Sequence, residues 1–313
     1  MKLLVTGADG LLGSAIMRNA KKLENVETIP LTHKHCDLTD FHATKAIFDY
    51  FLPDYVIHTA AVVGGIGSNM NHPGRFFCTN IAINTNVLEC ARLTKVEKLI
   101  SYMSTCVFPD NAPYPLNIEN IHDGPPHPSN AAYAYAKRML DVQSKAYHSE
   151  YGCNFATLIP TNLYGKNDNW DIENGHVIPS LVHKAVVAKA HNEPLVVWGT
   201  GKPLREFIYV DDMAAISLKC LLFGYLKEPL IVSPDEEISI NDVVKLIADC
   251  VQVDYEFDQS KPDGQMRKPS DNTKFKELFP NFTFRDIKVG IEETANFFIE
   301  YFDAGLPLRG VHH

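Results

Sequence analysis

The chain has 313 residues, of which 45% are hydrophobic and 21% charged, and this balance predicts a globular protein with a large core. Its net charge of −9 argues against nucleic acid or an anionic membrane as the main partner. No run approaches the roughly 20 apolar residues of a membrane span. The seven cysteines include no Cys-x-x-Cys pair, so neither a metal site nor a disulfide framework is expected, and a cytoplasmic location is favoured.

The first 100 or so residues alternate between strand-like and helix-like segments. Short apolar runs predict strands at Lys2–Thr6, 26–31, 55–60 and 98–104. Apolar residues spaced three or four apart predict helices at 11–23, 40–51 and 76–94. Such alternation is typical of an α/β fold with a doubly wound parallel sheet of the Rossmann type. Residues 1–165 are therefore expected to form a nucleotide-binding domain.

The rest of the chain has a different rhythm. Residues 105–132 are rich in Pro and Asn and predict a long loop, which in a compact domain is usually functional. A long helix at Ala131–Tyr151 and a strand at 155–163 follow. Beyond these, the pattern predicts helices at 176–191 and 212–224, strands at Leu195–Trp198 and 206–210, and a capping box at Ser239-Ile-Asn-Asp242. We expect residues 166–313 to form a smaller α/β substrate-binding domain, interleaved with the first because 205–235 return to it.

A glycine-rich segment, Gly7-Ala-Asp-Gly10-Leu11-Leu12-Gly13, separates the first strand from the first helix. Glycines there permit a tight turn and let backbone N–H groups approach a pyrophosphate at the helix N-terminus. A glycine turn also occurs in other α/β proteins, but a Tyr and a Lys farther along the chain favour dinucleotide binding. We therefore predict that these loop residues contact the cofactor.

The choice of cofactor depends on the residues after the second strand, where an acidic side chain would bind the ribose hydroxyls of NAD. The segment Leu31-Thr-His33-Lys34-His35 has no acid before Asp37. NADP(H) is therefore favoured over NAD, with His33 and Lys34 as candidate phosphate contacts. The alternative for Lys34 is a solvated turn residue.

Tyr133 and Lys137 lie four residues apart on the predicted helix 131–151 and so share a face. A carbonyl that accepts a hydride needs a proton on its oxygen, and a nearby cation would lower the high pKa of a tyrosine for this purpose. Ser104, at the end of the fourth strand, can orient the same oxygen. Tyr-x-x-x-Lys alone is usually just an exposed helix face, but its distance from the glycine loop strengthens the prediction. Tyr135 is rejected as the catalytic tyrosine because it lies two residues from Lys137, on another side of the helix.

These features resemble the extended short-chain dehydrogenase/reductase family, in its nucleotide-sugar class, along the whole chain. The resemblance also rests on His58-Thr-Ala-Ala61, Asn80, Pro160-Thr-Asn-Leu-Tyr-Gly165 and Arg205-Glu-Phe-Ile-Tyr-Val-Asp211. It implies cofactor contacts from Tyr133, Lys137, Ala60, Ala61, Pro160, Asn162, Leu163 and His176. It further implies a homodimer formed through the helices near 76–94 and 133–151.

The resemblance is closer still to members that act on GDP-4-keto-6-deoxy-D-mannose. It is carried by Ser104-Thr-Cys106-Val-Phe-Pro109, His176-Val-Ile-Pro179 and Trp198-Gly-Thr-Gly-Lys-Pro-Leu-Arg205. Epimerisation at C3 and C5, followed by NADPH-dependent reduction at C4, is what this implies. Protons next to a ketone are acidic, and inversion needs one group to remove a proton and another to deliver it. Cys106 as thiolate base and His176 as imidazolium acid suit this chemistry, although a lone Cys is more often a small buried hydrophobe and a lone His often a helix cap.

Basic and aromatic residues in the second half are candidates for binding the nucleotide of the substrate. Arg205 and Lys184 suit a diphosphate, and Trp198 a base or ribose. Relatives commonly carry Arg where this chain has Lys184, and some place a basic residue where it has Asp9. Arg267 is a candidate for closing over the sugar nucleotide, or else a solvated surface residue.

Two other functions fit parts of the pattern. A nucleotide-sugar 4-epimerase or 4-keto reductase would use the same Ser, Tyr and Lys but gives no reason for Cys106 and His176. A catalytically silent NADP-sensing protein would not need both Tyr133 and Lys137. The sequence also leaves a UDP- or dTDP-sugar open.

Overall fold

The computed structural model describes residues 1–311; His312 and His313, to which the sequence assigns no role, lie outside the described residues. The described chain divides into two compact units. The first combines Met1–Pro160 with Asp211–Val232, and the second combines Thr161–Val210 with the residues from Ser233 onward. Among the described residues, no helix is long and apolar enough to cross a membrane.

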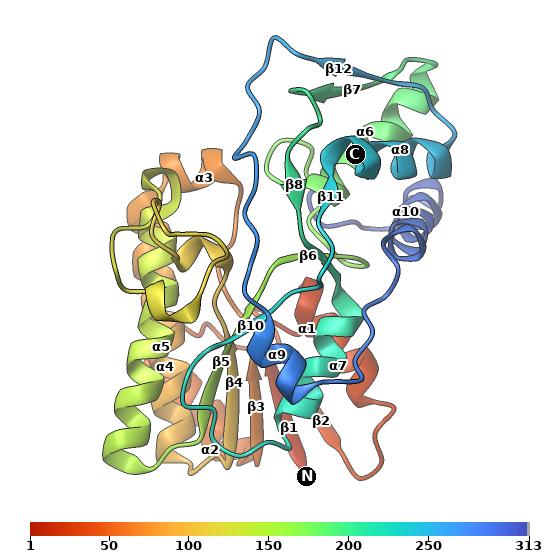
Figure 1. Ribbon diagram of the computed structural model, residues 1–313. Helices are drawn as coiled ribbons and strands as arrows, with labels where there is room; N and C mark the ends of the chain where they lie inside the picture. The colour runs from red at the N-terminus through yellow and green to blue at the C-terminus, as the bar shows by residue number, and fades with distance from the viewer. Residues whose placement is uncertain (312–313) are drawn as a thin grey trace. The chain divides into compact units, whose positions relative to one another are not determined.

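A parallel sheet forms the centre of the first unit (Figure 1). Within residues 1–311 it has six strands, in the order β10-β5-β4-β3-β1-β2. Their bounds are β1 Lys2–Thr6, β2 Glu27–Leu31, β3 Tyr55–His58, β4 Lys98–Tyr102, β5 Phe155–Pro160 and β10 Leu230–Val232. The register pairs Thr6 with Leu31 and with His58, so the loops after β1, β2 and β3 leave the same edge of the sheet. This architecture confirms the predicted α/β fold class.

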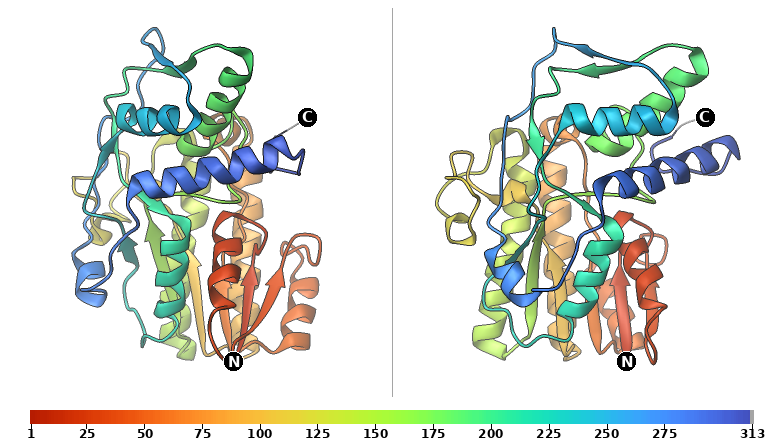
Figure 2. Two further views of the ribbon diagram at one scale, coloured as in Figure 1. Left: turned by 90° about the vertical axis from the view of Figure 1, so that its right-hand side faces the viewer. Right: turned by 45° about the vertical axis from the view of Figure 1, so that its right-hand side comes forward.

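Helices cover both faces of this sheet (Figures 1 and 2). On one face lie α2 (Phe41–Phe51), α4 (Pro73–Leu93) and α5 (Ala131–Tyr151), whose apolar residues pack in one core with those of the strands. On the other face, α1 (Leu11–Ala20) is joined to α7 (Val210–Cys220) by an Arg18–Asp211 ion pair of 3.3 Å. Helix α5 has the bounds that its sequence predicts, and it ends at Gly152 in the left-handed conformation.

The predicted loop between β4 and α5 contains short 3₁₀ helices: η1 (Thr105–Val107), η2 (Ile118–Asn120) and η3 (Pro128–Asn130). Proline and asparagine disfavour longer regular elements there, so the loop prediction is confirmed. The short helix α3 (Ile66–Asn71) escaped prediction because its sequence, with a glycine and two asparagines, lacks an apolar period.

The second unit is built from short strand pairs and helices (Figure 1). β6 (Asn162–Tyr164) pairs with β9 (Phe207–Tyr209), β7 (Leu195–Trp198) with β12 (Tyr255–Asp258), and β8 (Leu204–Arg205) with β11 (Ile238–Ser239). Helices α6 (Val177–His191), α8 (Ile240–Val251) and α10 (Ile287–Asp303) share one core, and α9 (Thr273–Leu278) completes the unit. The Ser239 hydroxyl caps α8 by accepting from the N–H of Asp242 at 3.0 Å, as predicted.

One predicted strand was wrong. Residues 155–163 do not form one strand, because β5 ends at Pro160 and β6 begins at Asn162 in a different sheet. The side chain and backbone N–H of Asn162 both bond to the carbonyl of Glu206, at 2.8 and 3.2 Å. These contacts lie far apart in sequence, so the apolar run alone carries no sign of the break.

Candidate active site

The glycine loop has the geometry that a dinucleotide pyrophosphate requires. Gly7 has φ of +67°, and a Cβ there would lie 2.9 Å from the backbone of Ala60. A Cβ on Gly13 would lie 2.0 Å from the carbonyl oxygen of Gly7. Both positions therefore need glycine, one for backbone conformation and one for close approach. The N-cap of α1 is Gly10, whose lack of a side chain leaves the first turn of this helix without a side-chain cap and suits an anion.

Beyond β2, His33 and Lys34 are both exposed, in a turn close to the glycine loop. The imidazole of His33 lies 3.7 Å from the carboxylate of Asp9, and both side chains are more than half exposed. An exposed pair of this kind contributes little to stability. Asp9 places a negative charge beside His33. Lys34, in the same turn, is not paired with Asp9.

Tyr133, Lys137 and Ser104 lie in the first unit, on α5 and at the N-terminus of η1. The Nζ atom of Lys137 is 5.9 Å from the centre of the Tyr133 ring, and Lys137 is 5% exposed. Tyr135 is 44% exposed, which agrees with its predicted place on another side of the helix. The hydroxyl of Ser104 accepts from the N–H of Cys106 at 3.4 Å, so the turn places the two residues together.

The direction of the tyrosine pKa differs from the expectation. Burial, followed by the charge of Cys106, raises the pKa of Tyr133 instead of lowering it. Burial also lowers the pKa of Lys137 to about 8. Desolvation dominates the pKa of Tyr133, and the Lys137 ammonium makes no hydrogen bond to the phenol that would oppose it. Tyr133 is thereby held as the neutral phenol, the form that can donate a proton.

A buried hydrogen-bonded chain that the sequence did not reveal supports α5. His58 lies 2.7 Å from the Thr6 hydroxyl through Nδ1 and 3.1 Å from the Asn84 side-chain oxygen through Nε2. The amide of Asn84 then donates to the carbonyl of Ala136 at 3.1 Å. This series of hydrogen bonds runs from β1 through β3 and α4 to Ala136, the residue before Lys137. It holds the first turns of α5 in place relative to the sheet.

His58 should make stability fall at acidic pH. Burial, with the nearby charge of Lys137, lowers the pKa of His58 to about 3. The folded form therefore stays neutral where an unfolded histidine, with a pKa of about 6.5, takes up a proton. Stability is full above pH 6.5 and should fall by about 1.4 kcal/mol per pH unit below it, down to about pH 3. We expect His58→Gln to remove this slope, as measured by thermal unfolding between pH 7.5 and 4.5; parallel curves for the two proteins would contradict it.

Cys106 lies in η1 and is partly buried, within electrostatic reach of Tyr133, Lys137 and Arg138. Cys36, Cys90 and Cys220 are by contrast buried. A partly exposed thiol next to cations fits a reactive cysteine better than a packing residue.

His176 is the N-cap residue of α6 in the second unit, and its side chain makes no capping hydrogen bond. Its Nδ1 lies 3.8 Å from the carboxylate of Asp168, a residue that is 2% exposed. Interaction with Asp168 raises the pKa of His176 against the effect of desolvation. The imidazolium form needed in an acid is thus favoured. Asp168 escaped prediction because Asn167-Asp-Asn169 has the pattern of an ordinary turn.

The predicted substrate contacts Lys184, Trp198, Arg205 and Arg267 all belong to the second unit. The Lys184 ammonium lies 5.2 Å from the centre of the Trp198 ring, which is 65% exposed and free to stack. Lys261, which the sequence did not indicate, lies 5.7 Å from the same ring.

Arg267 is 62% exposed in its side chain and donates to Glu237. The Thr200 N–H and hydroxyl both donate to Asp263 at 2.8 Å, which ties the segment before Arg267 to the Trp198 turn.

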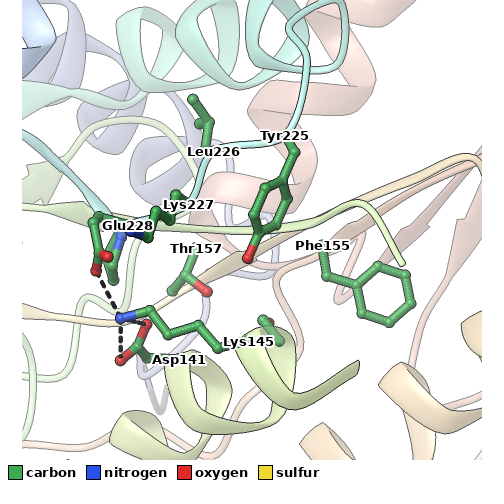
Figure 3. A pocket seen from close by; sticks show the side chains of 10 residues that line it. Asp141, Lys145, Phe155, Thr157, Tyr225, Leu226, Lys227 and Glu228 are labelled. Atoms are coloured by element: carbon green, nitrogen blue, oxygen red, sulfur yellow. Dashed lines mark hydrogen bonds and ion pairs between the residues drawn. The ribbon is translucent and has the colours of Figure 1, made fainter. Parts of the chain in front are cut away.

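Two hollows in the first unit differ greatly in size. One, of about 500 Å³, is lined by α3, the start of α4 and residues 127–132, directly before Tyr133. The other holds about 10 Å³, room for about one water. Figure 3 shows that Lys145 lies there between Asp141 and Glu228. The ammonium is 3.0 Å from the carboxylate of Asp141 and 2.7 Å from that of Glu228. This bridge joins α5 to the segment before β10, and we assign it a structural role.

The glycine cradle after the first strand of a parallel sheet, with a Tyr-Lys pair on a helix that covers one face of this sheet, defines a dinucleotide-dependent α/β enzyme. The model of the NAD dependent epimerase/dehydratase family matches residues 3–227. The chain belongs to this family.

Full-length relatives narrow the comparison. A GDP-L-fucose synthase from Dictyostelium discoideum is 45% identical over 96% of each chain. A probable GDP-L-fucose synthase from Drosophila melanogaster is 38% identical over 96% of this chain and 98% of its own. Among solved structures, the GDP-L-fucose synthetase from Naegleria fowleri bound to NADP matches with a TM-score of 0.92 and 42% identity, covering 96% of this chain and 93% of that one.

Proposed function

We propose that the chain is an NADPH-dependent epimerase–reductase that converts GDP-4-keto-6-deoxy-D-mannose to GDP-L-fucose. The observation that carries the proposal is Cys106, placed by one turn beside Ser104 and within electrostatic reach of Tyr133 and Lys137. A reductase alone has no use for this thiol. Similarity to GDP-L-fucose synthases along nearly the whole chain supports the same substrate.

The glycine loop would hold the cofactor pyrophosphate through the backbone of Gly10 to Gly13, and Lys137 would bind its nicotinamide ribose. When bound, NADPH supplies the hydride for C4. Ala60 and Ala61 follow β3, Pro160 ends β5, and Asn162 and Leu163 lie in β6; all five remain predicted contacts. Lys34 would meet the 2′-phosphate, in a turn where Asp9 already pairs with His33.

Epimerisation would be the work of Cys106 and His176. The Cys106 thiolate takes the proton from C3 or C5, and the Ser104 hydroxyl and the neutral Tyr133 phenol donate hydrogen bonds to the enolate oxygen. His176, kept protonated by Asp168, delivers a proton to the opposite face. In the reduction that follows, Tyr133 donates its proton to the C4 oxygen.

The second unit would bind the GDP moiety. Trp198 offers an exposed ring for stacking, Lys184 and Arg205 offer charges for the diphosphate, and Arg267 would approach the sugar nucleotide. We also propose a cytoplasmic homodimer. Exposed large apolar side chains on α4 and α5, namely Phe77, Val142 and Tyr151, support an interface there; light scattering of the purified protein tests it.

The function is tested by incubating the protein with GDP-4-keto-6-deoxymannose and NADPH, following absorbance at 340 nm and identifying the sugar by NMR. We expect stoichiometric NADPH oxidation and a product inverted at C3 and C5. A 4-epimerase would consume no NADPH, a simple reductase would leave C3 and C5 unchanged, and a cofactor-sensing protein would bind NADPH without turnover. Each of these results would overturn the proposal.

Lys34→Ala should reduce selectivity for NADPH. Loss of one charge-assisted contact to the 2′-phosphate is expected to raise KM for NADPH about tenfold. KM for NADH should change less than twofold, because NADH lacks that phosphate. Lys22→Ala, which removes an exposed lysine beyond the end of α1, is the matched control. Equal effects on both cofactors would contradict this assignment of Lys34.

A further inference from the structure

Arg138 follows Lys137 on α5 and is only 6% exposed, although arginine is rarely buried without an ionic partner. Its Nε atom donates to the carbonyl oxygen of Val107 at 2.6 Å. Val107 directly follows Cys106 in η1. One buried guanidinium therefore joins the turn that carries Cys106 to the helix that carries Tyr133 and Lys137.

The charge of Arg138 has an unusual set of partners. Its Nη2 atom is buried and makes no hydrogen bond to any described residue. The guanidinium carbon lies 5.3 Å from the centre of the Tyr135 ring. Burial lowers the pKa of Arg138, and the side chains that oppose this effect when they are ionised are Tyr135 and Cys106, neither of which is a carboxylate. A buried cation in this setting is stabilised most by a neighbour that can itself become an anion.

We propose that Arg138 is a positioning residue for epimerisation, which holds the Cys106 turn in place and stabilises Cys106 as the thiolate that removes the sugar proton. The proposal rests on the proposed function for its role in the reaction, but the effect on the thiol belongs to the free protein.

The other groups facing Cys106 cannot replace Arg138. From α5, Tyr133 and Lys137 act on it as well, and Ser104 faces it within the turn. Tyr133 is neutral and supplies no charge. Burial lowers the pKa of Lys137 to about 8, so this side chain loses its charge between pH 6 and 10, the range of the titration below. The guanidinium of Arg138 stays charged throughout this range, so its attraction for a thiolate does not vary with pH. A fixed neighbouring cation lowers a cysteine pKa.

The test is a titration of Cys106 in the intact free protein. Iodoacetamide alkylation is measured from pH 6 to 10, and the peptide carrying Cys106 is quantified by mass spectrometry. In the wild type we expect a midpoint below the ordinary cysteine value of about 8.5. Arg138→Gln should raise the midpoint by one pH unit or more, and Arg138→Lys should restore most of the shift. Arg92→Gln, which removes an arginine paired with Glu89, is the control and should leave the midpoint unchanged.

A second readout connects the thiol to the reaction. The pH midpoint for solvent deuterium incorporation at C3 and C5 should move with the alkylation midpoint in Arg138→Gln, while the pH profile of C4 reduction should not. An unchanged Cys106 midpoint in a folded Arg138→Gln protein would overturn the proposal. If that variant does not fold, a wild-type midpoint at or above 8.5 would overturn it equally. Absence of epimerase activity would refute the proposed function, whereas the thiol titration tests the effect of Arg138 on Cys106 separately.

Discussion

Tyr133→Phe is expected to lower the rate of C4 reduction by about 10²- to 10⁴-fold, the usual contribution of a positioned general acid. The phenol is buried and its pKa is raised, so at neutral pH Tyr133 carries the proton that the C4 oxygen needs. Phenylalanine keeps the ring, including its edge contact with Phe76 at 6.4 Å, and removes only the proton donor. The rate is measured from NADPH oxidation in single turnovers.

Tyr135→Phe is the matched control, since Tyr135 is on the same helix but exposed. It should change the rate less than twofold. Deuterium exchange at C3 and C5 should survive in Tyr133→Phe at a reduced level, because the enolate loses one of its hydrogen-bond donors. Reduction at the wild-type rate in Tyr133→Phe would refute the assignment of the acid.

The second large effect is expected for Cys106→Ser, which should slow epimerisation and leave reduction intact. A serine hydroxyl is not ionised near neutral pH, so the variant loses its base while the turn geometry is kept. We expect deuterium incorporation at C3 and C5 to fall by about 10²-fold or more. NADPH oxidation should persist on the uninverted ketone. NMR of the product distinguishes the two sugars.

His176→Gln should give a related loss with a different signature. This substitution removes the proton donor, so proton abstraction continues while inversion fails, and deuterium from the solvent is returned to the original face. Cys78→Ser, which alters an exposed cysteine on α4, should behave as the wild type. Full inversion at both carbons in Cys106→Ser would refute the role of the thiol.

The environments of the proposed base and acid differ in the sense that their roles require. Cys106 lies near Lys137 and Arg138, cations that favour a thiolate. His176 lies near the buried Asp168, an anion that favours imidazolium. Exchanging these surroundings would produce a neutral thiol and a neutral imidazole, which are poor partners for proton transfer near neutral pH.

Local patterns in the sequence were sufficient for the nucleotide-binding fold. The run Lys2–Thr6 and the helix Ala131–Tyr151 appear in the structure with the predicted bounds, because each has a clear period or a clear end signal. The glycine spacing was equally readable, since Gly7 and Gly13 are required by short-range geometry. Tyr133 and Lys137 share a helix face for the same local reason.

The tertiary structure alone decided how these groups are tuned. The strand predicted at 155–163 is divided at Thr161, where Asn162 bonds to the carbonyl of Glu206. The pKa of Tyr133 rises because the phenol is buried, although a lysine lies 5.9 Å from its ring. In the sequence, Arg138 looks like an ordinary helix residue and Asp168 like an ordinary turn residue. Their influence on Cys106 and His176 arises from burial and from contacts across the chain, which the identity and spacing of residues do not contain. The sequence by itself determined which reactive groups this protein carries, and the fold determined their protonation.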